Sequence, residues 1–130
     1  MCEQFGQNIG RCCRIDLAAI DATQAASFYR RMFGWESHSA FANGGSFIRF
    51  SLRGNTVASL YQLSAAQIAR GVPSHWTPYI GVGNVDESAS RAGELGGSVI
   101  VNPFDVDGEA RVGLIADPGG ALLGLWELSA

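Results

Sequence analysis

Residues 14–34 read RIDLAAIDATQAASFYRRMFG, and this stretch decides the fold. From Ile15 to Ala19 every second residue is apolar, which is the pattern of a half-buried β-strand. Asp21 follows, with Gln24 three residues later, and this pair has the spacing of a capping box, which satisfies free amides at a helix start. The glycine that closes the stretch supplies the left-handed conformation that often ends a helix. The stretch therefore predicts a strand followed directly by one helix.

Residues 77–97 read TPYIGVGNVDESASRAGELGG and repeat the same signals in the second half of the chain. Asn84 and Glu87 stand 63 residues after the first cap pair. Further on, residues 46–63 align with residues 111–128 without a gap, at an offset of 65. Such self-similarity marks an internal duplication. The chain is therefore predicted to contain two copies of one structural unit.

Each copy is predicted to form a strand, a helix and three further strands, an α+β arrangement written βαβββ. Turn signals that separate the later strands occur in residues 43–45, 53–55 and 117–120. Ser64 and Gln67 repeat the cap signal and predict a short helix between the copies. The predicted organisation is a first module over residues 12–63, a linker over 64–75 and a second module over 76–128.

A cleft between the modules is expected from the way each sheet is covered. One helix cannot cover both faces of the sheet that its own module forms. The two curved mixed sheets should therefore turn their other faces toward each other or toward a ligand. We expect a single domain, residues 1–130, built around such a cleft.

Composition and charge limit the partners. Nine Lys and Arg against 12 Asp and Glu give a net charge of −3, and no basic run occurs, so no nucleic-acid partner is expected. The first ten residues lack a signal-peptide pattern and no apolar run could span a bilayer, so no membrane partner and a cytoplasmic location are expected. The three cysteines lack the spacing of zinc ligands and are expected to be reduced thiols.

Several motifs occur at the spacing of one known family. They are Asp16-Leu17, Phe28-Tyr29, Phe33-Gly34-Trp35, HWTPYI at residues 75–80, Gly96-Gly97 and DPGGA at residues 117–121. With these motifs the chain resembles the vicinal oxygen chelate superfamily, which includes glyoxalase I, bleomycin-resistance proteins and extradiol dioxygenases. The resemblance implies tandem βαβββ modules, a small-molecule ligand and a homodimer.

In the metal-using members, the resemblance implies one ligand from the first strand and one from the last strand of each module. These places are occupied by Arg14, Ser59, Thr77 and Gly124. Divalent transition metals prefer imidazole, carboxylate or thiolate donors, and a guanidinium would repel them. We therefore expect neither a metal nor another cofactor. The two histidines, His38 and His75, are expected in loops, with surface or hydrogen-bonding roles.

Strand alternation indicates which residues share the cavity side with those four places. The expected ligand-binding residues are Arg14, Asp16, Arg49, Ser59, Tyr61, Thr77, Tyr79, Gly124 and Trp126. Residues of the opposite parity are uniformly apolar and should pack under the two helices. Gly124 should leave room for a ligand, and Trp35 and Trp76 are further candidates for the cavity rim.

Two alternatives stay open at these positions. Arg14, Asp16 and Arg49 either anchor a carboxylate, enolate or carbonyl group of a ligand, or form an ion pair that holds the sheets together. The aromatic residues either form flat walls for an aromatic guest or fill an ordinary core.

These observations favour a binding protein that sequesters an aromatic or drug-like metabolite. The alternative is a metal-independent lyase, isomerase or cyclase in which Asp16 is the general base and Arg14 or Arg49 stabilises an enolate. A metal-dependent glyoxalase-type lyase or dioxygenase is disfavoured by the residues at the four ligand places. The ligand itself is not specified by the sequence.

Overall fold

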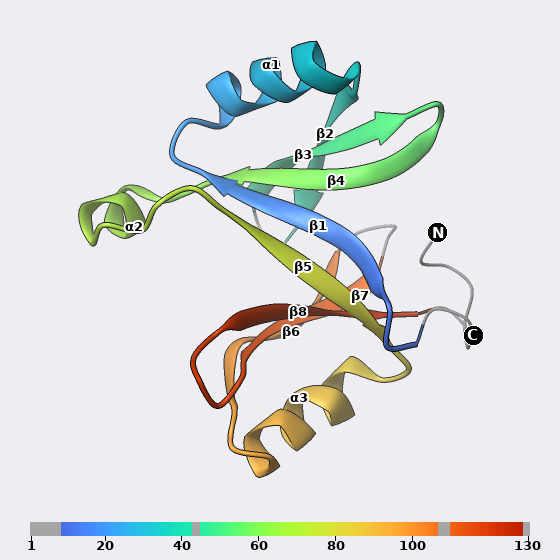
Figure 1. The fold of residues 1–130 in the computed structure, drawn as a ribbon, viewed down its shortest axis with the longest axis vertical. Coiled ribbons are helices and arrows are strands. Elements are labelled where there is room, and N and C mark those ends of the chain that lie inside the picture. The colour runs from blue at the N-terminus through green and yellow to red at the C-terminus, as the bar shows by residue number, and fades with distance from the viewer. Residues whose placement is uncertain (1–8, 43–44, 107–109, 129–130) are drawn as a thin grey trace. The chain divides into compact units, whose positions relative to one another are not determined.

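The computed structural model of the chain describes residues 9–42, 45–106 and 110–128 (Figure 1). These residues fall into two compact units. The N-terminal unit is Ile15–Trp76, and the C-terminal unit is Met1–Arg14 with Thr77–Ala130. Within the described ranges, no helix combines the length and the apolar character needed to cross a membrane.

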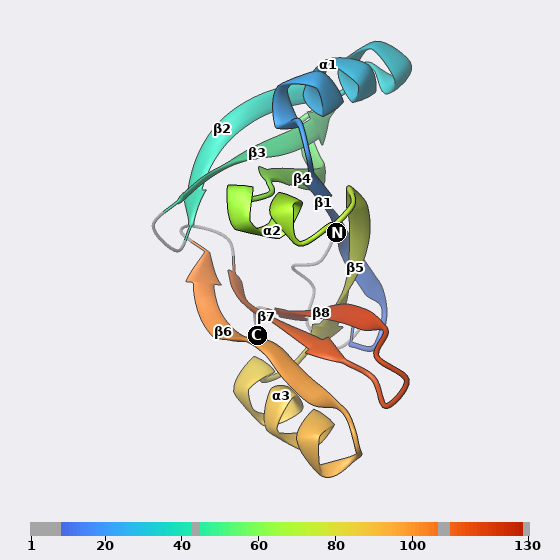
Figure 2. The same cartoon turned by 90° about the vertical axis from the view of Figure 1, so that its left-hand side faces the viewer.

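The N-terminal unit forms a four-stranded mixed sheet with one long helix on it. Its elements are β1 (Cys12–Ala19, from Ile15 onward), α1 (Ala22–Phe33), β2 (Glu36–Ala42), β3 (Gly45–Leu52), β4 (Asn55–Gln62) and α2 (Ala65–Ala69). The strand order is β2-β3-β4-β1, in which β1 and β4 are parallel and the other neighbours are antiparallel. The helix α1 packs on one face of this sheet, and the short helix α2 follows the end of β4 (Figure 2).

The C-terminal unit repeats this plan. Its elements are β5 (His75–Val82, from Thr77 onward), α3 (Val85–Glu94), β6 (Ser98–Val106), β7 (Ala110–Ala116) and β8 (Leu122–Glu127). The strand order is β5-β8-β7-β6, and again the first and last strands of the module, β5 and β8, are parallel. The predicted α+β fold of two tandem βαβββ modules with mixed sheets is therefore confirmed. The cleft expected between the modules stays a prediction.

The predicted helix caps are present in all three helices. Asp21 accepts a hydrogen bond from the Gln24 amide at the start of α1, and Asn84 accepts one from the Glu87 amide at the start of α3, both at 3.0 Å. Ser64 and Gln67 complete a reciprocal capping box at α2. Local side-chain chemistry thus fixes where each helix begins.

A second pair of equivalent side chains ties each helix start to the end of its module. The Gln62 side-chain oxygen accepts a hydrogen bond from the Ala22 amide at 2.8 Å. In the second module the Glu127 carboxylate accepts one from the Val85 amide at 2.9 Å. The positions are related by the offsets of the sequence repeat, 65 for the acceptors and 63 for the donors. The duplication therefore extends to individual hydrogen bonds.

The helix-facing sides of both sheets are apolar, as strand alternation predicts. Under α1, the core consists of Leu17, Ala19, Ala26, Phe50, Ala58 and Leu60, each no more than 4% exposed. Under α3, it consists of Val85, Ala89 and Leu125. Burial of these side chains stabilises each module by the hydrophobic effect. The residues of the opposite parity lie on the other face of each sheet and do not belong to these cores.

The two histidines and two tryptophans lie elsewhere than expected. His38 is inside β2 and His75 begins β5, so neither is in a loop. The prediction was wrong for His38 because β2, ESHSAFA, is an edge strand with little apolar alternation. Trp35 and Trp76, expected at the cavity rim, pack instead on the α1 side of the sheet, where the Trp76 indole donates a hydrogen bond to the Tyr29 hydroxyl at 3.2 Å.

Candidate functional site

A row of four polar residues crosses the N-terminal sheet on the face opposite α1. His38 pairs with Arg49 between β2 and β3, Arg49 with Ser59 between β3 and β4, and Ser59 with Asp16 between β4 and β1. Residues directly opposite in neighbouring strands project to the same face of a sheet. We call His38, Arg49, Ser59 and Asp16 the polar row. Three of its members, all but His38, are residues that the sequence predicts in the site.

Ser59 and Asp16 form the most closely defined contact of the polar row. The Ser59 hydroxyl donates a hydrogen bond to the Asp16 carboxylate at 2.7 Å, which is the short distance typical of a charged acceptor. Ser59 is only 8% exposed and Asp16 is half-buried. The bond joins β1 and β4 through their side chains and fixes the carboxylate on this face.

His38 is the member of the polar row that sequence reasoning missed. Its Nε2 atom lies 3.1 Å from the hydroxyl of Ser51, which is 7% exposed, and 4.0 Å from the exposed Glu36 carboxylate. Ser37, the next residue along β2, accepts a hydrogen bond from Arg30 of α1 and therefore points to the other face. The orientation of β2 is thus fixed on both sides.

Two aromatic residues lie beside the polar row. Phe47 and Tyr61 are two positions along β3 and β4 from Arg49 and Ser59, so they project to the same face, and both are half-buried. We call them the aromatic shelf. Burial, and then the negative charge of Asp16, raise the pKa of the Tyr61 hydroxyl. Tyr61 therefore stays protonated at neutral pH and can donate a hydrogen bond.

The equivalent row of the C-terminal sheet is largely apolar, with the Tyr79 hydroxyl as its one side-chain hydrogen-bonding group. Tyr79 pairs with Gly124, Gly124 with Leu114, and Leu114 with Val101. These positions follow Asp16, Ser59, Arg49 and His38 at the offsets of the repeat, 63 for the first and last and 65 for the middle two. One module therefore presents four polar side chains where the other presents a tyrosine, a glycine and two aliphatic residues.

The room expected at Gly124 is occupied by a side chain of the chain itself. A Cβ atom at this position would overlap the ring of Tyr79, its neighbour on β5. The glycine thus permits a close approach of an aromatic ring to the backbone. In the C-terminal unit this place is filled by Tyr79.

Trp126 belongs to a packed cluster that also holds Arg14. Trp126 is 9% exposed and packs with Val112 and Leu128, while the Tyr79 ring meets it edge-on at 6.4 Å between ring centres. The Arg14 guanidinium carbon lies 4.2 Å from the centre of the Trp126 ring, a cation–π contact. Of the two alternatives for the aromatic residues, core packing therefore describes the contacts of Trp126 within this unit.

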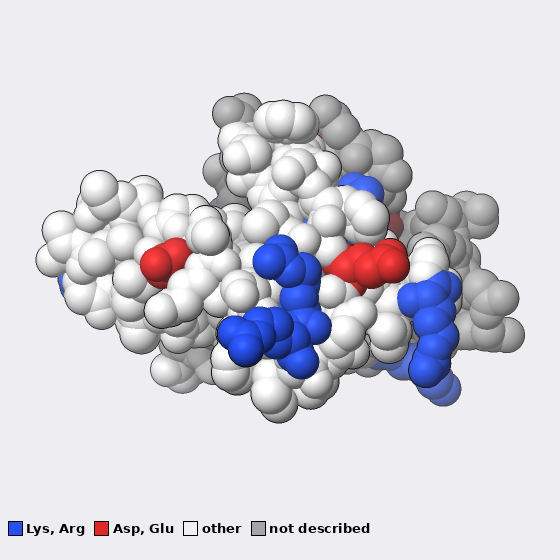
Figure 3. All heavy atoms as spheres, turned by 90° about the horizontal axis from the view of Figure 1, so that it is seen from above, with Lys and Arg blue, Asp and Glu red and all other residues white. Residues whose placement is uncertain are grey.

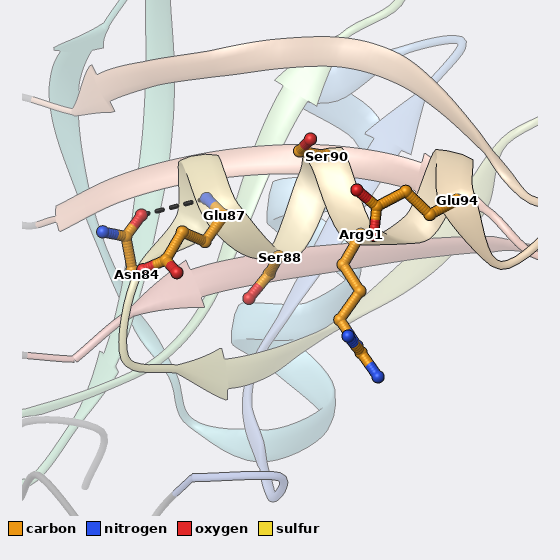
Figure 4. Close-up of a pocket in the computed structure, with 6 residues that line it drawn as sticks. All are labelled: Asn84, Glu87, Ser88, Ser90, Arg91 and Glu94. Atoms are coloured by element: carbon orange, nitrogen blue, oxygen red, sulfur yellow. Dashed lines mark hydrogen bonds between the residues drawn. The ribbon is translucent and has the colours of Figure 1, made fainter.

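Two other surfaces differ from the polar row in their chemistry. A hollow along α3 is lined by Asn84, Glu87, Ser88, Ser90, Arg91 and Glu94 (Figure 4). All six come from one helix and its cap, and none is a residue predicted in the site. On α1, Phe28, Met32 and Phe33 are 54%, 57% and 51% exposed, and the face seen in Figure 3 carries basic and acidic side chains among uncharged ones. Neither surface presents hydrogen-bonding groups from several strands, as the polar row does.

Residues 10–125 match the family model described as the Glyoxalase/Bleomycin resistance protein/Dioxygenase superfamily. The chain belongs to this superfamily.

Curated members of the superfamily resemble the chain over most of its length. A Mycobacterium tuberculosis protein named "Putative glyoxylase CFP32" is 32% identical over 115 residues, 87% of this chain and 44% of that protein. The anthracycline biosynthesis protein DnrV of Streptomyces peucetius is 32% identical over 122 residues, 85% of this chain and 44% of that protein. The chain thus spans less than half the length of these relatives.

Solved structures of the superfamily share the fold. A hypothetical protein of Bacillus halodurans superposes with a TM-score of 0.70 at 18% identity, covering 93% of this chain and 96% of that one. Streptomyces coelicolor methylmalonyl-CoA epimerase in complex with 2-nitronate-propionyl-CoA gives 0.67 at 20% identity, covering 94% and 96%. At these identities the likeness concerns the fold.

The four places that the superfamily pattern assigns to metal ligands do not fit a divalent ion here. The Ser59 hydroxyl is bonded to Asp16, and the Arg14 guanidinium lies over Trp126. Gly124 has no side chain, and Thr77, 7% exposed, offers only a hydroxyl. This set contains no imidazole, carboxylate or thiolate, the donors that such metals prefer. These four residues therefore do not form a site for a divalent transition metal.

Proposed function

We propose that the chain binds an oxygen-rich aromatic small molecule on the polar row and aromatic shelf, and that it sequesters this ligand. The observation that carries the proposal is the placement of carboxylate, hydroxyl, guanidinium and imidazole groups from four strands directly beside two aromatic side chains. Ligand sites typically combine such an apolar surface with a few convergent polar groups.

In this proposal the ring system of the ligand lies on Phe47 and Tyr61. Arg49 faces a carboxylate, phenolate or carbonyl oxygen, for which a guanidinium is a bidentate donor. The protonated Tyr61 hydroxyl is a second donor, and the Asp16 carboxylate accepts from a ligand hydroxyl. That Arg14, Thr77, Tyr79, Gly124 and Trp126 of the C-terminal unit contact a ligand stays a prediction from the sequence.

The relatives support an aromatic ligand class. Two proteins that are 32% identical to the chain are named for anthracycline biosynthesis, and anthracyclines contain fused aromatic rings bearing hydroxyl and quinone oxygens. Such a molecule offers flat faces for the aromatic shelf and peripheral oxygens for the polar row. The activity of the whole relatives is not carried over, because the chain spans only 44% of each.

A second proposal, metal-independent isomerisation or a related proton-transfer reaction, is favoured by the contact of Asp16 with Ser59. The carboxylate would remove a proton from a carbon next to a ligand carbonyl, leaving an enolate. Tyr61 and Arg49 could donate hydrogen bonds to the enolate oxygen. The proton returned to a different carbon would complete an isomerisation without any oxidant or metal.

Fluorescence titration with a dihydroxyanthraquinone tests the binding proposal. The wild type should bind, and Arg49→Gln should weaken binding at least about tenfold, because a charged hydrogen bond contributes roughly 1.5–3 kcal/mol. Arg31→Gln is the matched control, since Arg31 is exposed on α1, on the other side of the sheet. Equal affinities of Arg49→Gln and the wild type would contradict the proposal.

Product analysis of the same mixtures separates the two proposals. Unchanged ligand after prolonged incubation supports sequestration, whereas conversion that Asp16→Asn abolishes supports catalysis. Arg49→Gln is uninformative here because both proposals use Arg49. We also propose a cytoplasmic location, and a homodimer as the family resemblance implies; sedimentation velocity measures the assembly state directly.

A further inference from the structure

The polar row continues onto the edge strand β2, which makes it longer than a single aromatic ring. Asp16, Ser59, Arg49 and His38 stand on four successive strands. With neighbouring strands about 4.7–4.9 Å apart, the row extends for about 14 Å from Asp16 to His38. A ligand that engages both ends must therefore be elongated.

His38 is held as a hydrogen-bonding group at the outer end of the row. Its Nε2 atom lies 3.1 Å from the buried Ser51 hydroxyl, and its side chain is 56% exposed. Imidazole can donate or accept a hydrogen bond, so His38 can pair with a ligand hydroxyl or a ligand carbonyl. Exposure and fixed orientation together leave the ring available to a ligand.

Beside the aromatic shelf, the edge strand β2 carries a small side chain. Ala40 on β2 is paired directly with Phe47 of the aromatic shelf. An alanine at this place presents only a methyl group, so a flat molecule lying on Phe47 can continue across β2. The aromatic shelf and the polar row therefore run in the same direction toward the edge of the sheet.

We infer that His38 is a specificity-determining residue that selects elongated ligands of several fused rings over single-ring ligands. This inference rests on the proposed function. A linear polycyclic hydroxyquinone reaches from the Asp16–Ser59 end to His38, whereas a single-ring hydroxybenzoate held through its carboxylate at Arg49 does not span the row. His38 thus contributes affinity only to the longer ligand.

Titration of His38→Ala with two probes, a linear tetracyclic hydroxyquinone and a hydroxybenzoate, tests the inference. Loss of one hydrogen bond should weaken binding of the tetracyclic probe about tenfold and binding of hydroxybenzoate less than about twofold. His38→Gln, which keeps a donor and an acceptor, should restore most of the affinity for the tetracyclic probe. Ser39→Ala is the matched control, because Ser39 is the next residue of β2 and projects to the opposite face.

The outcomes separate this inference from the proposed function. Equal effects of His38→Ala on the two probes, or no effect on either, would overturn the role of His38 while leaving binding at Arg49 intact. Failure of the wild type to bind either probe would overturn the proposed function and this inference with it. A loss of tetracyclic binding in Ser39→Ala as large as in His38→Ala would show that β2 acts through its packing instead, and would also overturn the inference.

Discussion

Replacement of Gly124 by alanine tests how tightly the apolar row of the C-terminal unit is packed. A Cβ at this position would overlap three atoms of the Tyr79 ring, namely Cγ, Cδ2 and Cε2. Tyr79 has little freedom to withdraw, because its ring packs against the buried cluster of Val112, Trp126 and Leu128. We expect Gly124→Ala to lower the free energy of unfolding by about 1–3 kcal/mol, the usual cost of overpacking a core.

A double-mutant cycle assigns this loss to the contact between the two residues. In a Tyr79→Ala background the added methyl group has room, so Gly124→Ala should then cost less than about 0.5 kcal/mol, giving a coupling of at least about 0.5 kcal/mol. Urea unfolding followed by tryptophan fluorescence measures both values, provided that the m-values are unchanged. Gly93→Ala is the control, since no atom lies within 4 Å of a Cβ there and alanine favours the helix by about 0.5–1 kcal/mol.

One result would refute this reasoning. If Gly124→Ala destabilised the protein equally in both backgrounds, or not at all, the Tyr79 ring would not occupy the space at Gly124. Gly124 would then leave room for a ligand, as the sequence predicts. A large coupling energy between the two substitutions would mean that Tyr79 fills this space, so a ligand could contact this row only at residues other than Gly124.

Two further perturbations concern stability. Gln62→Ala removes the acceptor for the Ala22 amide and two donated hydrogen bonds, so it should lower the free energy of unfolding by about 1–2 kcal/mol. Gln62→Glu, which has the side chain of Glu127 in the second module, keeps the acceptor, so urea unfolding should show about half the decrease in the free energy of unfolding. Equal decreases in the two variants would contradict the capping role. Tyr61 has a raised pKa in the folded state, so its contribution to stability is present below the ordinary tyrosine pKa of about 10 and is lost as the pH rises through the raised value. Stability measured above about pH 10 should fall less steeply in Tyr61→Phe, and Asp16→Asn should move the phenol titration, followed by absorbance, toward its usual range; an unchanged slope and titration would argue against this environment.

Features encoded by short-range signals were predictable from the sequence. The caps at Asp21, Ser64 and Asn84 depend on residues three positions apart, and in the structure each cap side chain accepts a hydrogen bond from the amide three residues later. The duplication fixed the register as well, because equivalent residues pair identically in both modules, Asp16 with Ser59 and Tyr79 with Gly124. Local chemistry and repetition thus determined the fold class without any knowledge of tertiary contacts.

Features that depend on three-dimensional neighbours were not predictable in this way. His38 joins the polar row only because β2 pairs with β3, and an edge strand with a polar sequence gives no alternation signal. The filled space at Gly124 depends on where the Tyr79 ring lies, which no spacing rule specifies. The roles of Trp35 and Trp76 also followed from packing against α1 rather than from their parity along a strand.

The paired rows also have a consequence for protein engineering. Caps, closing hydrogen bonds and the helix-side cores are common to both modules, whereas the rows on the opposite faces share almost no chemistry. The same backbone frame has therefore already accommodated two unrelated sets of side chains at matched positions. Combinatorial libraries restricted to the polar row and its neighbours on that face should change ligand preference while retaining most of the stability, which makes each βαβββ module a reusable scaffold for new small-molecule binders.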